Sequence, residues 1–252
     1  MDEILVSVIM PAHNCSSFIK ETIESVLTQD IQNIEILVVD DCSQDETANI
    51  VESINDNRIK LIKNDANFGA AYSRNLAISL SKGKYIAFLD GDDIWMPNKL
   101  KSQIEFMEKN NYWFTYTNYS ILGNNKYYFS GPKKITHRRF FRRNYVGCLT
   151  VVFKRDIMPN LSIPTTIKSR NDYALWLKLS EKTNCYLFNE VLAKYRKHSG
   201  NSLSTAGARK LFVSHIKMFQ ELYGYNKFHA FLCASRNVFH ILLKNLLYRR
   251  KA

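Results

Sequence analysis

The sequence predicts an α/β fold: a mostly parallel sheet with helices on both faces, followed by a pair of amphipathic helices. In the first half of the chain, short apolar segments of strand length alternate with segments of helical periodicity. Two of the apolar segments end in carboxylates, and ligands bind to open α/β sheets at the carboxyl ends of the strands. Residues 205–252 show helical periodicity alone. The pattern therefore indicates a nucleotide-binding type of sheet with a helical appendage.

Composition and charge restrict the class of protein. The 252 residues are 46% hydrophobic and 13% aromatic, which is enough for one sizeable core. The net charge of +12 favours an anionic partner such as a nucleotide, a nucleic acid or a membrane surface. The five cysteines lack metal-type spacing, the start of the chain lacks a basic signal-peptide region, and no apolar run reaches about 18 residues. We therefore expect a cytoplasmic protein with reduced thiols and without a spanning helix.

The first ninety residues show four apolar segments separated by segments with helical spacing. We expect strands over residues 4–10, 34–39, 58–62 and 84–90, and helices over residues 18–28, 45–54 and 67–80. Pro11 is expected to end the first strand, and Asp45 is expected to cap the second helix. Alternation of this kind is typical of a parallel sheet.

Three carboxylates around one glycine, Asp90-Gly91-Asp92-Asp93, directly follow the apolar segment 85–89. Gly91 allows a tight turn that holds the acids at the end of the strand. Carboxylates so close together repel one another, and a bound Mg²⁺ or Mn²⁺ would relieve that repulsion through hard oxygen ligands. The alternatives are a solvated turn in which Asp93 caps a helix from about Pro97, or the similar triplet of polymerase palms.

A second acidic segment, Asp40-Asp41, follows the strand at 34–39, and Arg74 lies in the chain between the two acidic segments. Together they predict a pocket for a base or ribose and a metal-bound phosphate. A dehydrogenase needs a glycine-rich loop after its first strand, and a nucleotidyltransferase also needs one there. This chain has Pro11-Ala-His-Asn14 at that point, which argues against both classes.

The second half of the chain is expected to hold a helix over residues 97–109, strands over 112–119, 148–153 and 191–195, a hairpin or loop over 121–135, and a helix from residue 170 to 180. The basic run from Lys133 to Arg143 is either the solvated face of a short helix or an electropositive rim for an anionic acceptor. Arg196 and His198 lie two positions apart on an extended segment and therefore point the same way. Such a pair suits a diphosphate, although a lone histidine is more often structural.

Five segments together resemble the bacterial inverting glycosyltransferases of family two, which have the GT-A nucleotide-diphospho-sugar transferase fold and assemble surface polysaccharides such as O-antigen, capsule and teichuronic acid. The segments are Pro11-Ala-His-Asn14, Asp40-Asp41-x-Ser43-x-Asp45-x-Thr47, Asn67-x-Gly69 with Arg74-Asn75, Asp90-Gly-Asp92-Asp93, and Asp172 with Tyr195-Arg196-x-His198. The resemblance covers about residues 4–204. It implies a catalytic domain over residues 1–204 and a C-terminal helical appendage over residues 205–252.

The resemblance also implies roles for single residues. The UDP-sugar donor would be bound by Pro11, Asn14, Asp41, Asn67, Arg74, Asp90, Arg196 and His198. Within that set, Pro11 and Asp41 would hold the uracil and Asp90 the ribose. Asp92, with Asp93 and His198, would bind Mn²⁺ or Mg²⁺. Asp172 would be the general base. Family members commonly have Glu-Asp where this chain has Asn171-Asp172, so any assistance from the first acid is absent.

The implied reaction moves a hexose or N-acetylhexosamine from a UDP-sugar to a hydroxyl group of a lipid-linked saccharide. One base without an enzyme nucleophile implies a single displacement and therefore inversion at the sugar. The alternative is a catalytically inactive basic module that binds a membrane or nucleic acid, and the intact acids argue against it. Nucleic-acid binding would also need aromatic residues interleaved with basic ones on an exposed sheet. The identity of the sugar is left open.

Residues 228–252 combine an apolar stripe with cations. The apolar residues are Phe231, Leu232, Val238, Phe239, Leu242, Leu243, Leu246 and Leu247, and the cations are Arg236, Lys244, Arg249, Arg250 and Lys251. Such a helix can lie in the interface of an anionic membrane, which would place the protein peripherally on the inner face of the cell membrane. The alternative is a terminal helix packed on the catalytic core.

Overall fold

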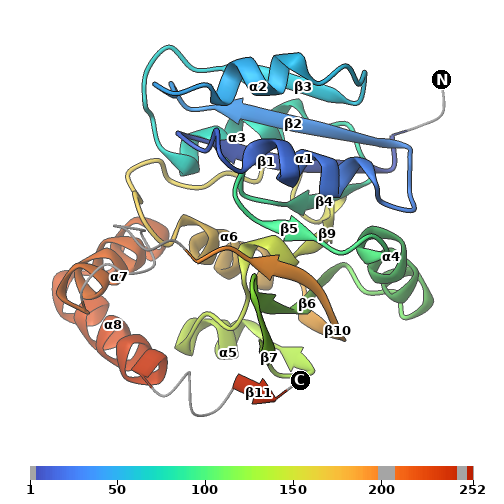
Figure 1. The fold of residues 1–252 in the computed structure, drawn as a ribbon. Coiled ribbons are helices and arrows are strands. Elements are labelled where there is room, and N and C mark those ends of the chain that lie inside the picture. The colour runs from blue at the N-terminus through green and yellow to red at the C-terminus, as the bar shows by residue number, and fades with distance from the viewer. Residues whose placement is uncertain (1–3, 198–207, 243–248, 252) are drawn as a thin grey trace.

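The computed structural model describes residues 4–197, 208–242 and 249–251, and Figure 1 shows their arrangement. The N-terminal part is a parallel sheet in the order β4-β1-β2-β3. Its strands are β1 (Val6–Ala12), β2 (Ile34–Asp40), β3 (Ile59–Lys63) and β4 (Tyr85–Phe88). Every residue of β1, β2 and β4 is buried, as expected for parallel strands covered on both faces.

Helices cover both faces of this sheet because alternate side chains of each strand point to opposite faces. Val8 and Met10 of β1 pack with the helices α1 (Ile19–Leu27), α2 (Thr47–Ser53) and α4 (Lys99–Lys109). Ile9 lies between them in the chain and packs on the other face, with α3 (Ala70–Leu80) and α6 (Asn171–Ser180). The predicted α/β fold class is therefore confirmed.

Beyond β4 the sheet continues with strands of mixed direction. The antiparallel strand β9 (Val152–Lys154) joins β4 to β6 (Phe114–Ile121), and β6 pairs in parallel with β10 (Cys185–Tyr195). Short strands complete the edges: β5 (Ile94–Trp95), β7 (Asn124–Phe129), β8 (Lys134–Ile135) and β11 (Arg249–Lys251). The acidic turn after β4 thus runs directly into β5, which pairs with β10. This pairing brings Arg196, the residue after β10, to the acidic turn.

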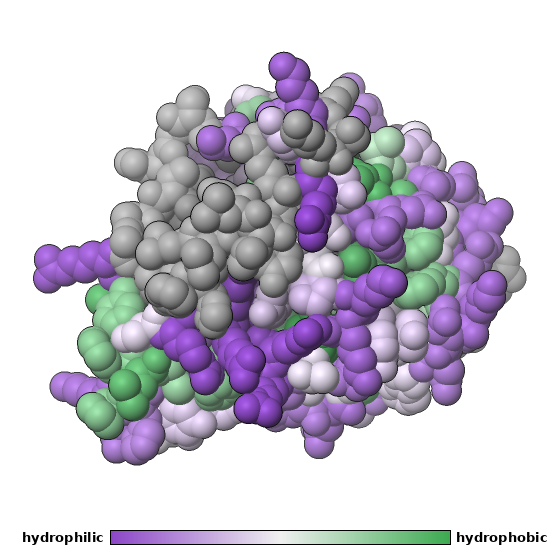
Figure 2. Space-filling model, turned by 90° about the horizontal axis from the view of Figure 1, so that it is seen from below, coloured by the Kyte–Doolittle hydropathy of each residue, from purple (hydrophilic) through white to green (hydrophobic). Residues whose placement is uncertain are grey.

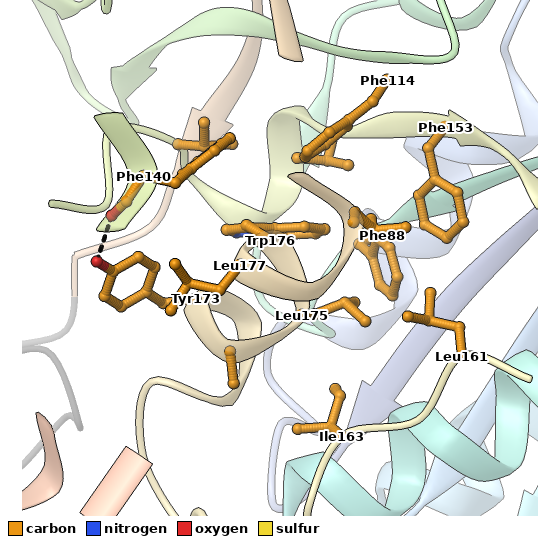
Figure 3. Close-up of a cluster of buried hydrophobic side chains, with 14 of the residues drawn as sticks. Phe88, Phe114, Phe140, Phe153, Leu161, Ile163, Tyr173, Leu175, Trp176 and Leu177 are labelled. Atoms are coloured by element: carbon orange, nitrogen blue, oxygen red, sulfur yellow. Dashed lines mark hydrogen bonds between the residues drawn. The ribbon is translucent and has the colours of Figure 1, made fainter. Parts of the chain in front are cut away.

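Aromatic packing fixes the helix α6 under the sheet (Figure 3). The ring of Trp176 packs edge to face on Phe88 of β4, with the ring centroids 5.5 Å apart. The centroid of Phe114 of β6 lies 5.7 Å from that of Trp176. The hydroxyl of Tyr173 lies 2.5 Å from the carbonyl oxygen of Phe140, which belongs to α5 (His137–Arg142). Because these contacts hold the helix on three neighbours, its first turn, with Asn171 and Asp172, has a defined place beside the carboxyl ends of the strands.

Three boundaries predicted from the sequence are wrong. The strand β1 continues through Pro11, which loses no ladder bond because the pairing with β4 ends at Ile9. Residues 148–150 form a 3₁₀ helix, so only Val152 and Phe153 of the predicted strand over 148–153 belong to β9. The predicted strand over 191–195 is the last part of the longer β10, with irregular pairing at Val191.

The predicted amphipathic helices are α7 (Ala208–Tyr223) and α8 (Lys227–Leu242), at the left of Figure 1. Asn237 joins α8 to α5 and α6: its amide donates to the carbonyl of Phe141, and its Oδ1 lies 2.9 Å from the Tyr173 hydroxyl. Residues 249–251 were expected to extend a helix, but they form β11, paired with β7. None of the described helices is long and apolar enough to cross a bilayer.

Candidate active site

The carboxylate of Asp41, at the end of β2, holds the loop that leads into α3. It accepts hydrogen bonds from the backbone of Phe68 at 3.0 Å and Gly69 at 2.7 Å, and from the Asn64 amide at 2.7 Å. Gly69 has φ +90°, a conformation that favours glycine. The side chain of Asp41 is buried, and its hydrogen bonds fix the loop that borders the site. If Asp41 also contacts uracil, as predicted, the same carboxylate has to serve both the base and the three hydrogen bonds given above.

A histidine connects the loops that follow the first three strands. The Nδ1 of His13 lies 2.9 Å from the backbone oxygen of Asp41, and its Nε2 lies 3.1 Å from the Asn67 amide. Because a carbonyl only accepts, Nδ1 carries the proton and Nε2 accepts from Asn67. Asn14 adopts φ 49°, and its Oδ1 accepts from the backbone of Gln44 at 2.8 Å. The predicted donor-binding residues Asn14 and Asn67 therefore lie together at one edge of the sheet.

Arg74 joins the two halves of the site. One guanidinium nitrogen donates to Asp90 after β4, and the other donates to the side-chain oxygen of Asn171 at the start of α6. The Arg74 side chain is buried, and burial lowers its pKa. The charges of Asp90 and Asp172 outweigh this effect, so the pKa lies above the ordinary value and Arg74 stays charged. Its Nε has no partner among the described residues.

Asp172, the predicted base, lies in the first turn of α6 and is half-buried. Its charge acts on Arg74 and on the buried thiol of Cys148, and so does the charge of Asp90. Both carboxylates are thus within electrostatic reach of the same two groups. The structure therefore brings the candidate base and the acids after β4 into one site, although many residues separate them in the chain.

The acidic turn places its three carboxylates in different environments. Asp93 is buried, and its pKa is raised well above the usual range by burial and by the charges of Asp92 and Asp90. One Asp93 oxygen accepts the backbone N–H of Arg196 at 2.9 Å. Asp93 therefore anchors the end of β10, while Asp90 and Asp92 are half-buried at the surface of the site.

Arg196 lies beside this turn. Its Nε donates to the backbone oxygen of Asp92 at 2.8 Å, and another nitrogen pairs with Glu21 of α1 at 2.5 Å. Its guanidinium also lies 4.7 Å from the centroid of the Phe18 ring. These contacts make Arg196 a clamp on the acidic turn. His198, the other predicted residue of this segment, lies outside the described residues.

The residues of the turn suit a divalent cation that is shared with a diphosphate. Within the part of the chain that the structure describes, no three His, Cys, Asp or Glu side chains surround one metal position. Mg²⁺ typically takes only one or two carboxylates from the protein and completes its shell with substrate phosphates and water. The repulsion that raises the pKa of Asp93 is also relieved when a cation binds beside Asp90 and Asp92. The oxygen ligands that the acidic turn offers therefore fit Mg²⁺ or Mn²⁺.

Sequence reasoning missed several residues that build the site. Asn64 and Glu21 carry no motif and contribute through contacts across the fold. Asn171 was read as the loss of an acid, whereas here its amide oxygen binds Arg74. A buried arginine needs hydrogen-bond acceptors, and this need was the signal that could have identified Asn171.

Comparisons with known proteins identify the family. Residues 7–158 match the family model for glycosyl transferase family 2. Over 200 residues, 78% of each chain, the protein is 44% identical to UDP-Glc:alpha-D-GlcNAc-diphosphoundecaprenol beta-1,3-glucosyltransferase WfgD of Escherichia coli. It is 38% identical over 251 residues, 98% of each chain, to WfaP, an enzyme of the same name and organism. It is also 38% identical over 199 residues to the putative teichuronic acid biosynthesis glycosyltransferase TuaG of Bacillus subtilis, covering 76% of this chain and 79% of TuaG.

Solved structures share the fold. Residues 1–349 of Staphylococcus aureus TarS, in complex with UDP-GlcNAc, match with a TM-score of 0.74 and 21% identity, covering 96% of this chain and 74% of that one. The mannosyltransferase PcManGT from Pyrobaculum calidifontis, in complex with GDP-Man and Mn²⁺, matches with a TM-score of 0.65 and 17% identity, covering 94% and 70%. The family model covers more than half of the chain, and the relatives align over most of its length. The protein belongs to glycosyl transferase family 2.

Proposed function

We propose that the protein is an inverting glycosyltransferase that moves a hexose or N-acetylhexosamine from a UDP-sugar to a hydroxyl group of a lipid-linked saccharide. The observation that carries this proposal is the double contact of Arg74, which binds Asp90 on the nucleotide side and Asn171 beside Asp172. A donor held at the acids after β4 therefore has its sugar next to the one carboxylate of α6's first turn.

In this reaction Asp172 takes the proton of the acceptor hydroxyl group as the new glycosidic bond forms. A hydroxyl group is a poor nucleophile, and general-base assistance typically raises the rate by about 10²–10⁴. The attacking oxygen approaches from the α6 side, and the diphosphate leaves toward the acidic turn. One displacement without an enzyme nucleophile inverts the configuration, so an α-linked donor gives a β-linked product.

Donor binding is assigned to the residues around the carboxyl ends of β1, β2 and β4. Pro11 and Asp41 line the side proposed for uracil, with Asn14 and Asn67 at its rim, and Arg74 and Asp90 lie toward the ribose and diphosphate. Asp92 would hold Mn²⁺ or Mg²⁺, with Asp93 behind it and His198 as a further ligand. A divalent cation there would stabilise the charge that grows on the leaving diphosphate.

The relatives narrow the substrates to be tested. WfgD and WfaP are named as enzymes that use UDP-Glc and a GlcNAc-diphosphoundecaprenol acceptor. We therefore place UDP-glucose first among the donors and a GlcNAc-diphosphate-lipid first among the acceptors. The test is incubation of the protein with a panel of UDP-sugars and a GlcNAc-diphosphate-alkyl acceptor, followed by mass spectrometry of the products. A mass increase of one sugar supports the proposal, and no transfer from any UDP-sugar contradicts it.

A lipid-linked acceptor places the enzyme at the inner face of the cell membrane, and the C-terminal helices offer a surface for that position. Phe228, Phe231 and Leu232 of α8 are 67%, 49% and 50% exposed. In Figure 2, hydrophobic side chains lie beside hydrophilic ones on the left, the side on which α7 and α8 lie. Exposed arginines of α5 (Arg138, Arg139 and Arg142) add positive charge. The helix α8 thus packs on the core by one side and is proposed to touch the membrane by the other.

A further inference from the structure

A basic cavity lies between the loop before α6 and the outer side of α7, and none of the motifs includes it. Its volume is about 540 Å³. The loop contributes Thr166, Ile167, Lys168 and Ser169, and α7 contributes Arg209, Val213, Ser214 and Lys217. A hydrogen bond of 2.7 Å between the hydroxyl groups of Ser169 and Ser214 joins the two walls.

The lining of the cavity suits an anion. Among the described residues that line it are three cations and three hydroxyl groups, and none of these lining residues is a carboxylate. Lys168, Arg209 and Lys217 are exposed, and none of them forms an ion pair with a carboxylate of the described residues. Cations and hydroxyl donors around one space are the groups that bind phosphate oxygens.

The cavity lies close to the candidate base. Ser169 precedes Asp172 by three residues, a length of chain that spans roughly 11 Å at most. A second cavity, of about 250 Å³, shares Thr166 and Lys168 with the first and is also lined by Phe68 and Tyr72. Phe68 belongs to the loop held by Asp41, so this second cavity adjoins the donor side. The basic cavity and the candidate base are therefore joined by one short segment, residues 169–172.

Apolar surface continues from the cavity in the other direction. Val213 is 48% exposed, and the neighbouring Phe212 meets Phe231 of α8 edge to face at 5.3 Å. A ligand for this region therefore has a sugar at one end, an anionic middle and an apolar tail. We infer that the basic cavity binds the diphosphate that links the acceptor saccharide to its lipid. This inference rests on the proposed function and assigns a subsite to the acceptor.

The experiment compares two acceptors in detergent solution without vesicles: a GlcNAc-diphosphate-alkyl compound and the neutral alkyl glycoside of the same sugar. The double variant Arg209→Gln/Lys217→Gln is expected to raise the KM for the diphosphate acceptor by about tenfold or more, since charge-assisted hydrogen bonds are lost. The KM values for the neutral acceptor and for the UDP-sugar stay unchanged. Arg209→Lys/Lys217→Arg, which keeps both charges, should retain the affinity.

The matched control is Lys101→Gln/Lys109→Gln, which removes two exposed cations from α4, on the opposite side of the molecule from α7 (Figure 1). It should leave every constant unchanged. An equal loss for both acceptors, or no change for either, overturns the inference. So does a variant that binds anionic vesicles less well while its acceptor KM is unchanged, because the cations then serve the membrane.

Calorimetric titration of the diphosphate acceptor without donor separates this inference from the proposed function. If the wild type binds this acceptor but transfers no sugar, and the Gln variant loses the binding, the subsite stands and the proposed reaction fails. If transfer occurs but both proteins bind the acceptor equally, the reaction stands and the subsite fails.

Discussion

Arg74 is the residue on which the geometry of the site depends most. Its buried guanidinium keeps its charge because Asp90 and Asp172 lie near it, and its two donors fix the relative positions of Asp90 and Asn171. A carboxylate that is meant to take a proton must be placed within hydrogen-bond reach of the acceptor. Arg74 supports this placement through its hydrogen bond to Asn171, the neighbour of Asp172 in the first turn of α6.

Replacement of Asp172 by Asn is expected to lower kcat by about 10²–10⁴, the amount that general-base catalysis supplies. Affinity for UDP in the presence of Mn²⁺ should stay at the wild-type value, because the donor side is built by other elements. Steady-state kinetics and calorimetry measure the two quantities. A variant that transfers sugar at nearly the wild-type rate would show that another carboxylate, with Asp93 the first to test, is the base.

Replacement of Asp92 by Asn is expected to abolish transfer and to weaken UDP binding in the presence of Mn²⁺ while the protein stays folded. The reason is that Asn removes the negative charge of the half-buried Asp92 carboxylate, the group proposed to hold the cation. EDTA should have the same effect on the wild type, and added Mn²⁺ or Mg²⁺ should reverse it. Full transfer by the wild type in excess EDTA would rule out the metal-dependent mechanism.

Among the elements, α4 carries a buried charge that the reaction does not use. Lys99 has no exposed surface, its Nζ donates to the Gln103 side chain at 2.9 Å, and it lies 4.3 Å from the centroid of the Trp95 ring. Burial lowers the pKa of Lys99 to about 7. The face of Trp95 favours the charged form and acts in the opposite direction. The cost of burying this lysine therefore depends on pH.

Because the pKa of Lys99 is lower in the folded state, the free energy of unfolding should rise with pH. Below about pH 7 the folded and unfolded states both carry the proton, and the folded state bears the full cost of the buried charge. Between about 7 and 10.5, the unfolded chain binds a proton that the folded one does not, so the free energy of unfolding increases by up to about 1.4 kcal/mol per pH unit. Urea unfolding of the wild type and Lys99→Met at several pH values measures this gain. Parallel curves for the two proteins would refute it.

At the scale of the whole molecule, the C-terminal segment is part of the fold and also an exposed surface. Ala230, Ala234 and Asn237 are buried against the body, whereas Phe228 and Phe231 face outward. The strand β11 further ties the end of the chain to β7. A chain that ends near Lys227 would lose these contacts, so we expect it to be less stable, and point substitutions are the better test of membrane binding.

The triple variant Phe228→Ser/Phe231→Ser/Leu232→Ser is expected to stay folded, because the three side chains are exposed. It should co-sediment with anionic vesicles at least about tenfold more weakly than the wild type, since three apolar side chains no longer enter the interface. High salt should weaken the binding of the wild type too. The exposed Leu80 of α3 provides the control Leu80→Ser, which should bind vesicles normally. A wild type that ignores anionic vesicles at low salt would exclude the docking surface.

The sequence by itself determined the alternation of strands and helices in the first ninety residues, the two acidic strand ends and the family. These depend on local information: apolar runs, helical spacing and the rule that ligands bind at the carboxyl ends of parallel strands. The continuation of β1 through Pro11 escaped it, because a proline is tolerated wherever a neighbouring strand leaves its ladder position unused. Likewise, the end of the chain joins the sheet as β11 through its pairing with β7, which local periodicity does not encode.

Only the tertiary structure decided which distant residues meet. Arg74 and Asn171 are 97 positions apart and contact because aromatic packing sets α6 against the sheet. The basic cavity exists because α7 packs beside the loop before α6, and neither segment is a site alone. Such contacts depend on the packing of whole elements, in which each side chain is chosen for its neighbours in space. That is why a motif could locate the acids of this site, whereas only the fold could join them to Asp172, the proposed base, and reveal the cavity that we propose for the acceptor.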